Sequence, residues 1–199
     1  MTFTVINDTV QTDVRAYIMN ITVYLGAYEG NDLLIKEAVR ELGTWIGVSG
    51  HRLVYGGSKA GLMGVLAESV VSAGGEAIGV EPAFFVEQEI QYEELTQLIV
   101  TRDMTERKAK MVELGDAFIA LPGGTGTLEE ISEIMSKTSL GYLHAPCIIY
   151  NHNGYYNGLK QLLANMIEHG LSTKERQNRI CFAESIADII RILKKTGSP

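Results

Sequence analysis

Cysteine, proline and long apolar runs are all scarce in this chain of 199 residues. Its two cysteines, Cys147 and Cys181, are too few for a disulfide framework and lack the spacing of metal ligands. Because both stand in apolar runs, they are predicted to be buried thiols. No stretch reaches the roughly 18 apolar residues of a membrane span, and the N-terminus has no basic segment followed by an apolar core. We therefore expect a cytoplasmic protein that does not bind membranes.

Positive charge is scarce as well. The chain has 17 Lys+Arg against 24 Asp+Glu, a net charge of −7 at pH 7, and no run of basic residues. This balance argues against a nucleic-acid polymer as a partner, although a local site can still bind a small anion. The composition, 46% hydrophobic and 21% charged, is that of an ordinary globular protein. Twenty-one glycines against four prolines direct attention to glycines with backbone roles.

From Met19 onward, short apolar runs alternate with longer amphipathic stretches. The predicted strands are Ile21–Leu25, Arg52–Tyr55, Ala77–Val80, Gln97–Val100, Ala117–Leu121, Pro146–Tyr150 and Arg179–Phe182. The predicted helices are Asp32–Val48 (with Asn31 as N-cap), Leu62–Ala73, Met104–Leu114, Leu128–Leu140, Tyr156–His169 and Glu184–Lys195. This alternation predicts an α/β fold: a doubly wound, Rossmann-like, mostly parallel sheet of about seven strands with helices on both faces. We expect residues 1–18 to be an N-terminal extension and residues 19–199 a single domain.

Two of the predicted strands end in glycine-rich turns, Tyr55–Gly64 and Pro122–Glu130. Glycines let the backbone turn sharply and bring bare N–H groups close to a ligand, and the helix that follows adds its own unpaired N–H groups. Either turn alone could be no more than a tight turn of the backbone. Two glycine-rich turns at the same edge of the sheet favour a phosphate-binding site. The turn after the first strand, Gly26–Gly30, is predicted to form a third wall of this site. Neither turn matches a Walker loop or a GxGxxG dinucleotide fingerprint.

Two charged residues near these turns have both structural and functional interpretations. Thr127 followed by Glu130 forms a potential capping box, with Thr127 as N-cap and Glu130 returning to its backbone N–H. Arg107 shares a predicted helix face with Met104 and Met111. It could be a surface residue whose stem covers apolar area, or it could pair with a phosphate or carboxylate at the same sheet edge.

The motifs themselves resemble those of a known family. Pro122–Glu130 matches the pattern PGGxGTxxE in every fixed position, and Met104–Met111, with Arg-Lys between methionines, resembles its companion element. Tyr55–Gly64 is similar to the glycine-rich GLMG turn, and Gly154–Asn157 is similar to a further segment. By these motifs the chain resembles the "lonely guy" (LOG) family of cytokinin riboside 5′-monophosphate phosphoribohydrolases, historically labelled possible lysine decarboxylases.

This resemblance implies hydrolysis of the N-glycosidic bond of an adenosine 5′-monophosphate, often N6-substituted, to free base and ribose 5-phosphate. It implies Arg107 and Glu130 as the catalytic pair, no metal or organic cofactor, and, together with the methionine-bearing helix faces, a homodimer. Arg107 would either orient the Glu130 carboxylate or stabilise negative charge on the departing base. The nucleotide and phosphate site would draw on Gly57, Ser58, Glu89, Lys108, Gly123, Gly124, Thr125, Gly126, Thr127, Glu129 and Ser136.

Two departures from the family pattern keep alternatives open. The first turn commonly reads Gly-Ser-Ser where this chain has Gly26–Tyr28, and the second commonly has three glycines where this chain has Gly56–Ser58. A non-catalytic nucleotide sensor or carrier would use the same turns. A lysine decarboxylase would need a lysine Schiff base with pyridoxal phosphate. Lys59 and Lys108, the only lysines near the glycine-rich turns, lack that context.

Overall fold

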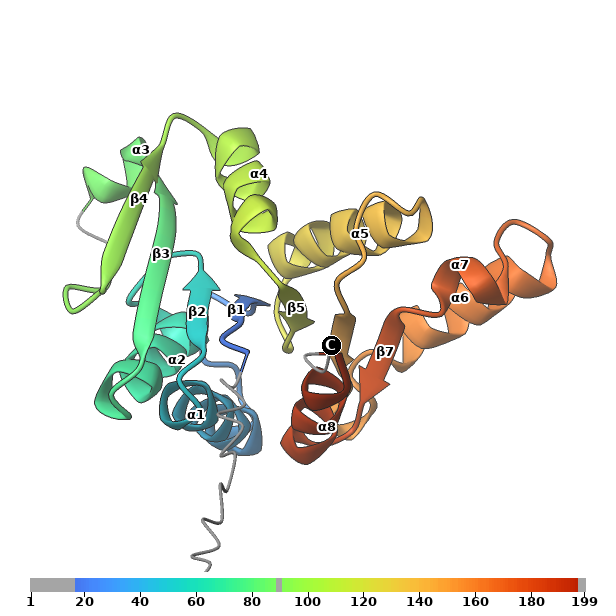
Figure 1. The fold of residues 1–199 in the computed structure, drawn as a ribbon, viewed down its shortest axis with the longest axis horizontal. Helices are drawn as coiled ribbons and strands as arrows, with labels where there is room; N and C mark the ends of the chain where they lie inside the picture. Colours follow the sequence, from blue (N-terminus) through green and yellow to red (C-terminus); the bar gives the residue numbers. More distant parts are fainter. Residues whose placement is uncertain (1–16, 89–90, 197–199) are drawn as a thin grey trace, which may run out of the picture.

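The computed structural model describes residues 17–88 and 91–196. In this part of the chain, seven strands form one parallel sheet in the order β4-β3-β2-β1-β5-β6-β7 (Figure 1). Each predicted strand is present, with ends that differ from the prediction by at most one or two residues. The strands are β1 Asn20–Tyr24, β2 Arg52–Tyr55, β3 Glu76–Pro82, β4 Gln97–Thr101, β5 Ala117–Ala120, β6 Cys147–Tyr150 and β7 Ile180–Ala183. The Rossmann-like α/β prediction is confirmed.

The six predicted helices are also present. They are α1 Leu33–Val48, α2 Gly61–Ser72, α4 Met104–Leu114, α5 Thr125–Ser139, α6 Asn157–Glu168 and α8 Ile186–Thr196. Two four-residue helices, α3 Ala83–Val86 and α7 Lys174–Gln177, and a 3-10 turn, His152–Gly154, were not predicted because they are too short to show a helical period. None of the helices in the described part of the chain is long and apolar enough to cross a membrane.

Two predicted helix starts were wrong. The N-cap of α1 is Asp32, whose side chain accepts a hydrogen bond from the Leu34 N–H, and not Asn31. The N-cap of α5 is Gly124, three residues before the predicted Thr127, which lies inside the helix. The structure therefore contradicts the capping box.

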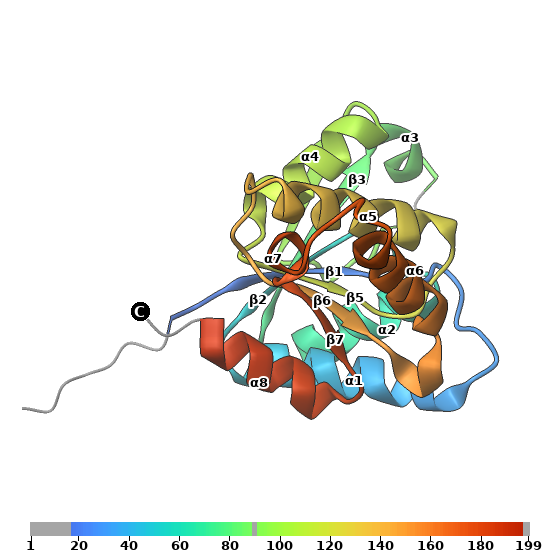
Figure 2. The same cartoon turned by 90° about the vertical axis from the view of Figure 1, so that its right-hand side faces the viewer.

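Helices cover both faces of the sheet, with α1, α2 and α8 on one side and α4, α5 and α6 on the other (Figure 2). Each layer has its own apolar core: Leu42 and Leu66 belong to the first, and Met111 and Ile134 to the second. This two-sided coverage explains why the central strands are almost continuously apolar. Cys147 is buried as predicted. Cys181 is only partly buried, because it lies on β7 at the edge of the sheet.

The contact between α1 and α2 depends on two glycines one helical turn apart. A Cβ at Gly43 would lie 2.7 Å from the Ser69 Cβ, and one at Gly47 would lie 2.7 Å from the Val70 carbonyl oxygen. We expect Gly47→Val to lower the free energy of unfolding by about 1–3 kcal/mol, because the added side chain meets backbone that cannot yield cheaply. Urea unfolding monitored by circular dichroism measures this loss.

The matched control for that substitution is Gly158→Val in α6. Gly158 is exposed, and a Cβ there would meet nothing within 4 Å. This variant is expected to unfold close to the wild type. Equal unfolding midpoints for the two variants would contradict close packing of α1 on α2.

The strand order reverses between β1 and β5, which are adjacent in the sheet. In open parallel sheets, ligands bind beyond the carboxyl ends of the strands at such a switch point. The turns after β1 and β5 both leave the sheet at this place, and the turn after β2 lies next to them. The sequence therefore brings its glycine-rich turns to one edge.

Candidate active site

A pocket of about 1130 Å³ lies at this edge of the sheet. Its walls are the turns after β1, β2 and β5, the end of β3, one face of α4, and the segment around the 3-10 turn. Among the lining residues are Gly26 and Tyr28 of the first turn, Ser58 of the second, and Pro122–Thr127 of the third. The predicted third wall at Gly26–Gly30 is therefore part of the pocket.

The turn between β5 and α5 has the geometry of an anion site. No side chain caps the N-terminus of α5 at Gly124, so the N–H groups of its first turn remain available to a ligand. Gly123 must be glycine because a Cβ there would collide with the Thr127 side chain and lie 2.9 Å from the Gly26 amide nitrogen. Tyr155, which also lines the pocket, fixes the turn by donating a hydrogen bond of 2.7 Å to the Gly123 carbonyl.

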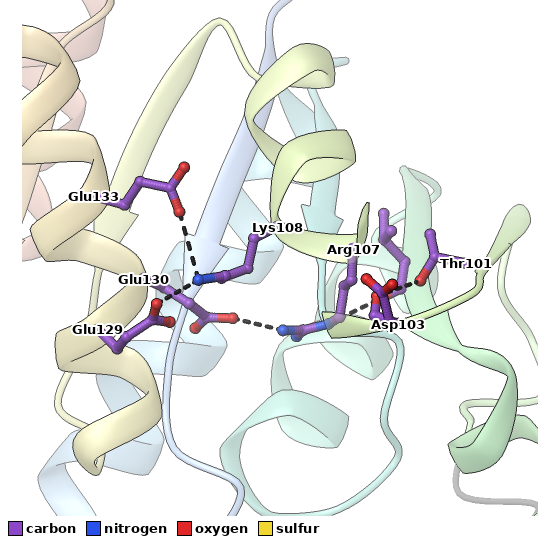
Figure 3. Close-up of polar contacts among 8 residues, drawn as sticks. Thr101, Asp103, Arg107, Lys108, Glu129, Glu130 and Glu133 are labelled. Atoms are coloured by element: carbon purple, nitrogen blue, oxygen red, sulfur yellow. Dashed lines mark hydrogen bonds and ion pairs between the residues drawn. The ribbon is translucent and has the colours of Figure 1, made fainter. Parts of the chain in front are cut away.

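Arg107 and Glu130 form an ion pair inside the pocket. Arg107 Nη1 lies 2.6 Å from Glu130 Oε1, and each side chain is only 11% exposed (Figure 3). Arg107 Nε also donates a 3.0 Å hydrogen bond to the Val80 carbonyl, which fixes the guanidinium plane. A Cβ at Gly56 would collide with that guanidinium, so the β2 turn needs glycine there. Arg107 is thus not a surface residue, and the partner of Glu130 is Arg107 rather than a helix N-terminus.

The electrostatics of Glu130 reflect two opposing effects. Burial raises the pKa of the Glu130 carboxyl, and the Arg107 charge and hydrogen bond lower it. Burial is the larger effect, so the pKa of Glu130 lies above its ordinary value, and Arg107 limits that rise. The nearby Tyr24 hydroxyl also has a raised pKa, because of its burial and then the Glu130 charge, and it remains protonated.

Several other predicted site residues lie outside the pocket lining. Lys108 does come together with Glu129, but this ion pair bridges α4 and α5 outside the pocket lining, where Lys108 also lies 3.7 Å from Glu133 (Figure 3). Ser136 is exposed further along α5. Gly57 has a φ of +88° and packs against Glu81, and it is absent from the lining although its neighbours Gly56 and Ser58 belong to it. Glu89 lies outside the described residues.

The sequence did not reveal Glu81 and His152 as residues of the pocket. Glu81 lies at the end of β3, and His152 Nε2 lies 2.9 Å from Asp32 Oδ2 on the opposite side of the pocket. The available signal for Glu81 was a carboxylate directly after the apolar run Ala77–Val80 and immediately before Pro82. His152 gave no such signal, because its partner is 120 residues away.

The fold and the pocket together define a doubly wound α/β protein with a large pocket at the topological switch point, where ligands bind in such sheets. Within that class, residues 63–193 match the family model described as "Possible lysine decarboxylase". The chain belongs to this family, which is the LOG family. The relatives described next belong to the same family.

Those relatives align over almost the whole chain. The chain is 38% identical over 187 residues to the cytokinin riboside 5′-monophosphate phosphoribohydrolase of Rhodococcoides fascians, and the alignment covers 94% of each. It is 36% identical over 182 residues to the enzyme of the same name, LOG1, from Arabidopsis thaliana, covering 92% of this chain and 85% of the relative.

Solved structures of the same fold are more distant in sequence. The molybdenum cofactor binding protein of Rippkaea orientalis superposes with a TM-score of 0.70 at 22% identity, covering 90% of this chain and 98% of that one. The molybdenum cofactor carrier protein of Chlamydomonas reinhardtii also gives 0.70, at 20% identity and with the same coverage. At these identities the likeness describes the fold alone.

Proposed function

We propose that the protein is a nucleoside 5′-monophosphate phosphoribohydrolase, which hydrolyses the N-glycosidic bond of AMP or an N6-modified AMP. The products are free base and ribose 5-phosphate. The observation that carries the proposal is the buried Arg107–Glu130 pair, held in a pocket directly beside the uncapped N-terminus of α5. The activity for which relatives at 36–38% identity are named supports the same reaction.

The positions of these groups fit the chemistry. A 5′-phosphate bound by the N–H groups of Gly124–Thr127 would place the ribose toward Glu130, on the next turn of the same helix. Cleavage of the C1′–N9 bond develops positive charge on the ribose, and a carboxylate beside the sugar stabilises that charge. The same carboxylate can accept a proton from the attacking water. Arg107 favours the ionised form of Glu130 that both tasks need, because its charge and hydrogen bond lower the pKa of the carboxyl.

A second candidate is a nucleotide sensor or carrier without chemistry. The specific observation in its favour is that Tyr28 and Ser58, the two departures from the family turns, both line the pocket. Saturable AMP binding without base release would support this alternative.

Lysine decarboxylation has no support in the described residues. A Schiff-base lysine would have to line the pocket, and none of the lining residues in the described part of the chain is a lysine. Lys59 lies 3.9 Å from Glu93 outside it, and Lys108 pairs with Glu129 and Glu133.

The test is a chromatographic assay of the purified protein with AMP and with N6-isopentenyl-AMP. Release of base and ribose 5-phosphate in equal amounts is expected, and the ratio of kcat/KM values identifies the preferred nucleotide. Binding of either nucleotide with no base release over hours at micromolar protein would contradict the proposal and favour the carrier.

We also propose that the protein is a cytoplasmic homodimer. Exposed apolar side chains on and after α4 and α5, among them Met104, Leu128 and Leu140, offer a surface for self-association. Multi-angle light scattering at the assay concentration is expected to give twice the chain mass of 21.8 kDa. A monomer mass would contradict it.

A further inference from the structure

Glu81 is a buried carboxyl that the proposed reaction has not yet used. It lies near the end of β3, where it lines the pocket, and only 2% of its surface is exposed. No donor among the described residues reaches its Oε2 atom. A buried polar atom without a partner is rare and costs free energy, so its retention in a ligand pocket points to a partner that arrives with the ligand.

The surroundings of Glu81 differ sharply from those of Glu130, although both are close to Arg107. The guanidinium donates to Glu130 through Nη1 and to the Val80 carbonyl through Nε, and it makes no hydrogen bond to Glu81. The Gly57 turn packs against the Glu81 side chain, where a Cβ at Gly57 would lie 3.3 Å from the Oε2 atom. Burial raises the pKa of Glu81 more strongly than the Arg107 charge lowers it. One carboxyl is therefore paired with Arg107, and the other has a buried oxygen without a hydrogen-bond partner among the described residues.

An acid and a base held apart in this way are what glycosidic hydrolysis requires. A purine leaves poorly as an anion, so a proton must reach one of its ring nitrogens as the bond breaks. Arg107 cannot supply it, because a guanidinium does not deprotonate in a protein. Tyr24, with its raised pKa, is a much weaker acid than a carboxyl.

We propose that Glu81 is the general acid that protonates the departing purine. This inference rests on the proposed phosphoribohydrolase function. The Glu81 carboxyl contacts the base and gives its proton to a ring nitrogen while the C1′–N9 electron pair leaves with the base. Water bonds to C1′ and loses a proton to the Glu130 carboxylate. Return of that proton to Glu81 through solvent restores both groups and balances the reaction.

The test compares two leaving groups in the wild type and in Glu81→Gln. Glutamine keeps the shape and hydrogen-bonding capacity of the side chain but cannot release a proton. We expect kcat on AMP to fall by ~10²-fold or more with KM changed little, the loss typical of a missing general acid. On 4-nitrophenyl β-D-ribofuranoside 5-phosphate, whose leaving group needs no protonation, Glu81→Gln is expected to match the wild type.

The matched control is Glu76→Gln at the other end of β3, where Glu76 pairs with Arg52 at the surface. It is expected to leave both rates unchanged. Wild-type kcat for Glu81→Gln on AMP would overturn the proposal, and so would an equal loss on both substrates, which would indicate a structural role. A wild-type protein that releases nothing from either substrate would instead refute the phosphoribohydrolase function itself.

Discussion

Glu130→Gln is expected to lower the turnover of AMP by ~10²-fold or more while the protein stays folded. Glutamine is nearly isosteric, and its carbonyl oxygen can still accept the hydrogen bond that Arg107 Nη1 donates. What disappears is the negative charge beside the ribose and the ability to accept a proton from water. Losses of this size are typical when one positioned charge or general base is removed from a preorganised site.

The measurement is kcat and KM for AMP by chromatography of the released base. The matched control is Glu133→Gln on the same helix, since Glu133 pairs with Lys108 and Lys137 outside the pocket. The control is expected to keep wild-type turnover. Wild-type kcat in Glu130→Gln would remove Glu130 from the mechanism.

Arg107→Met is expected to lower the free energy of unfolding by about 3–5 kcal/mol at neutral pH and to abolish turnover. The substitution leaves the Glu130 carboxylate buried without its partner, and breaking a buried pair from one side typically costs this much. Without Arg107, burial raises the pKa of Glu130 further above its unfolded value. The cost therefore grows as the pH rises above the usual carboxyl range and disappears below it, where Glu130 is protonated in both states.

The double variant Arg107→Met/Glu130→Leu separates stability from catalysis. Replacing both charges by apolar side chains removes the uncompensated carboxylate, so most of the lost stability is expected to return. Turnover is expected to stay absent, because neither charge acts on the substrate. Guanidinium unfolding at a fixed pH measures the free energies. A double variant no more stable than Arg107→Met alone would show that the pair is not coupled as the geometry indicates.

The architecture could be predicted because it depends on local patterns. Apolar runs such as Ala117–Leu121 between amphipathic stretches already define buried parallel strands and covering helices. The helix starts depend on more distant contacts. Asn31 and Asp32 are both good caps, and the structure uses Asp32, which also contacts His152 far along the chain. Similarly, Gly123 packs against the Gly26 turn, and α5 begins directly after it.

The residues of the candidate site were likewise predictable only in part. Arg107 and Glu130 stand in recognisable motifs, so they could be named in advance, but their 2.6 Å contact joins elements that no local pattern relates. The role of Glu81 could not be predicted, because it depends on the Gly57 turn and Arg107, which lie next to the end of β3 only in the folded chain. Lys108 stands in the same motif as Arg107, yet one position along α4 is enough to direct it to the surface pair with Glu129.

The most direct test of the proposed activity is the fate of AMP in water enriched in ¹⁸O. We predict equal amounts of adenine and ribose 5-phosphate, with one ¹⁸O atom on C1 of the sugar before exchange, because water attacks C1′. Adenosine and labelled inorganic phosphate, or bound AMP with no product at all, would contradict hydrolysis of the N-glycosidic bond.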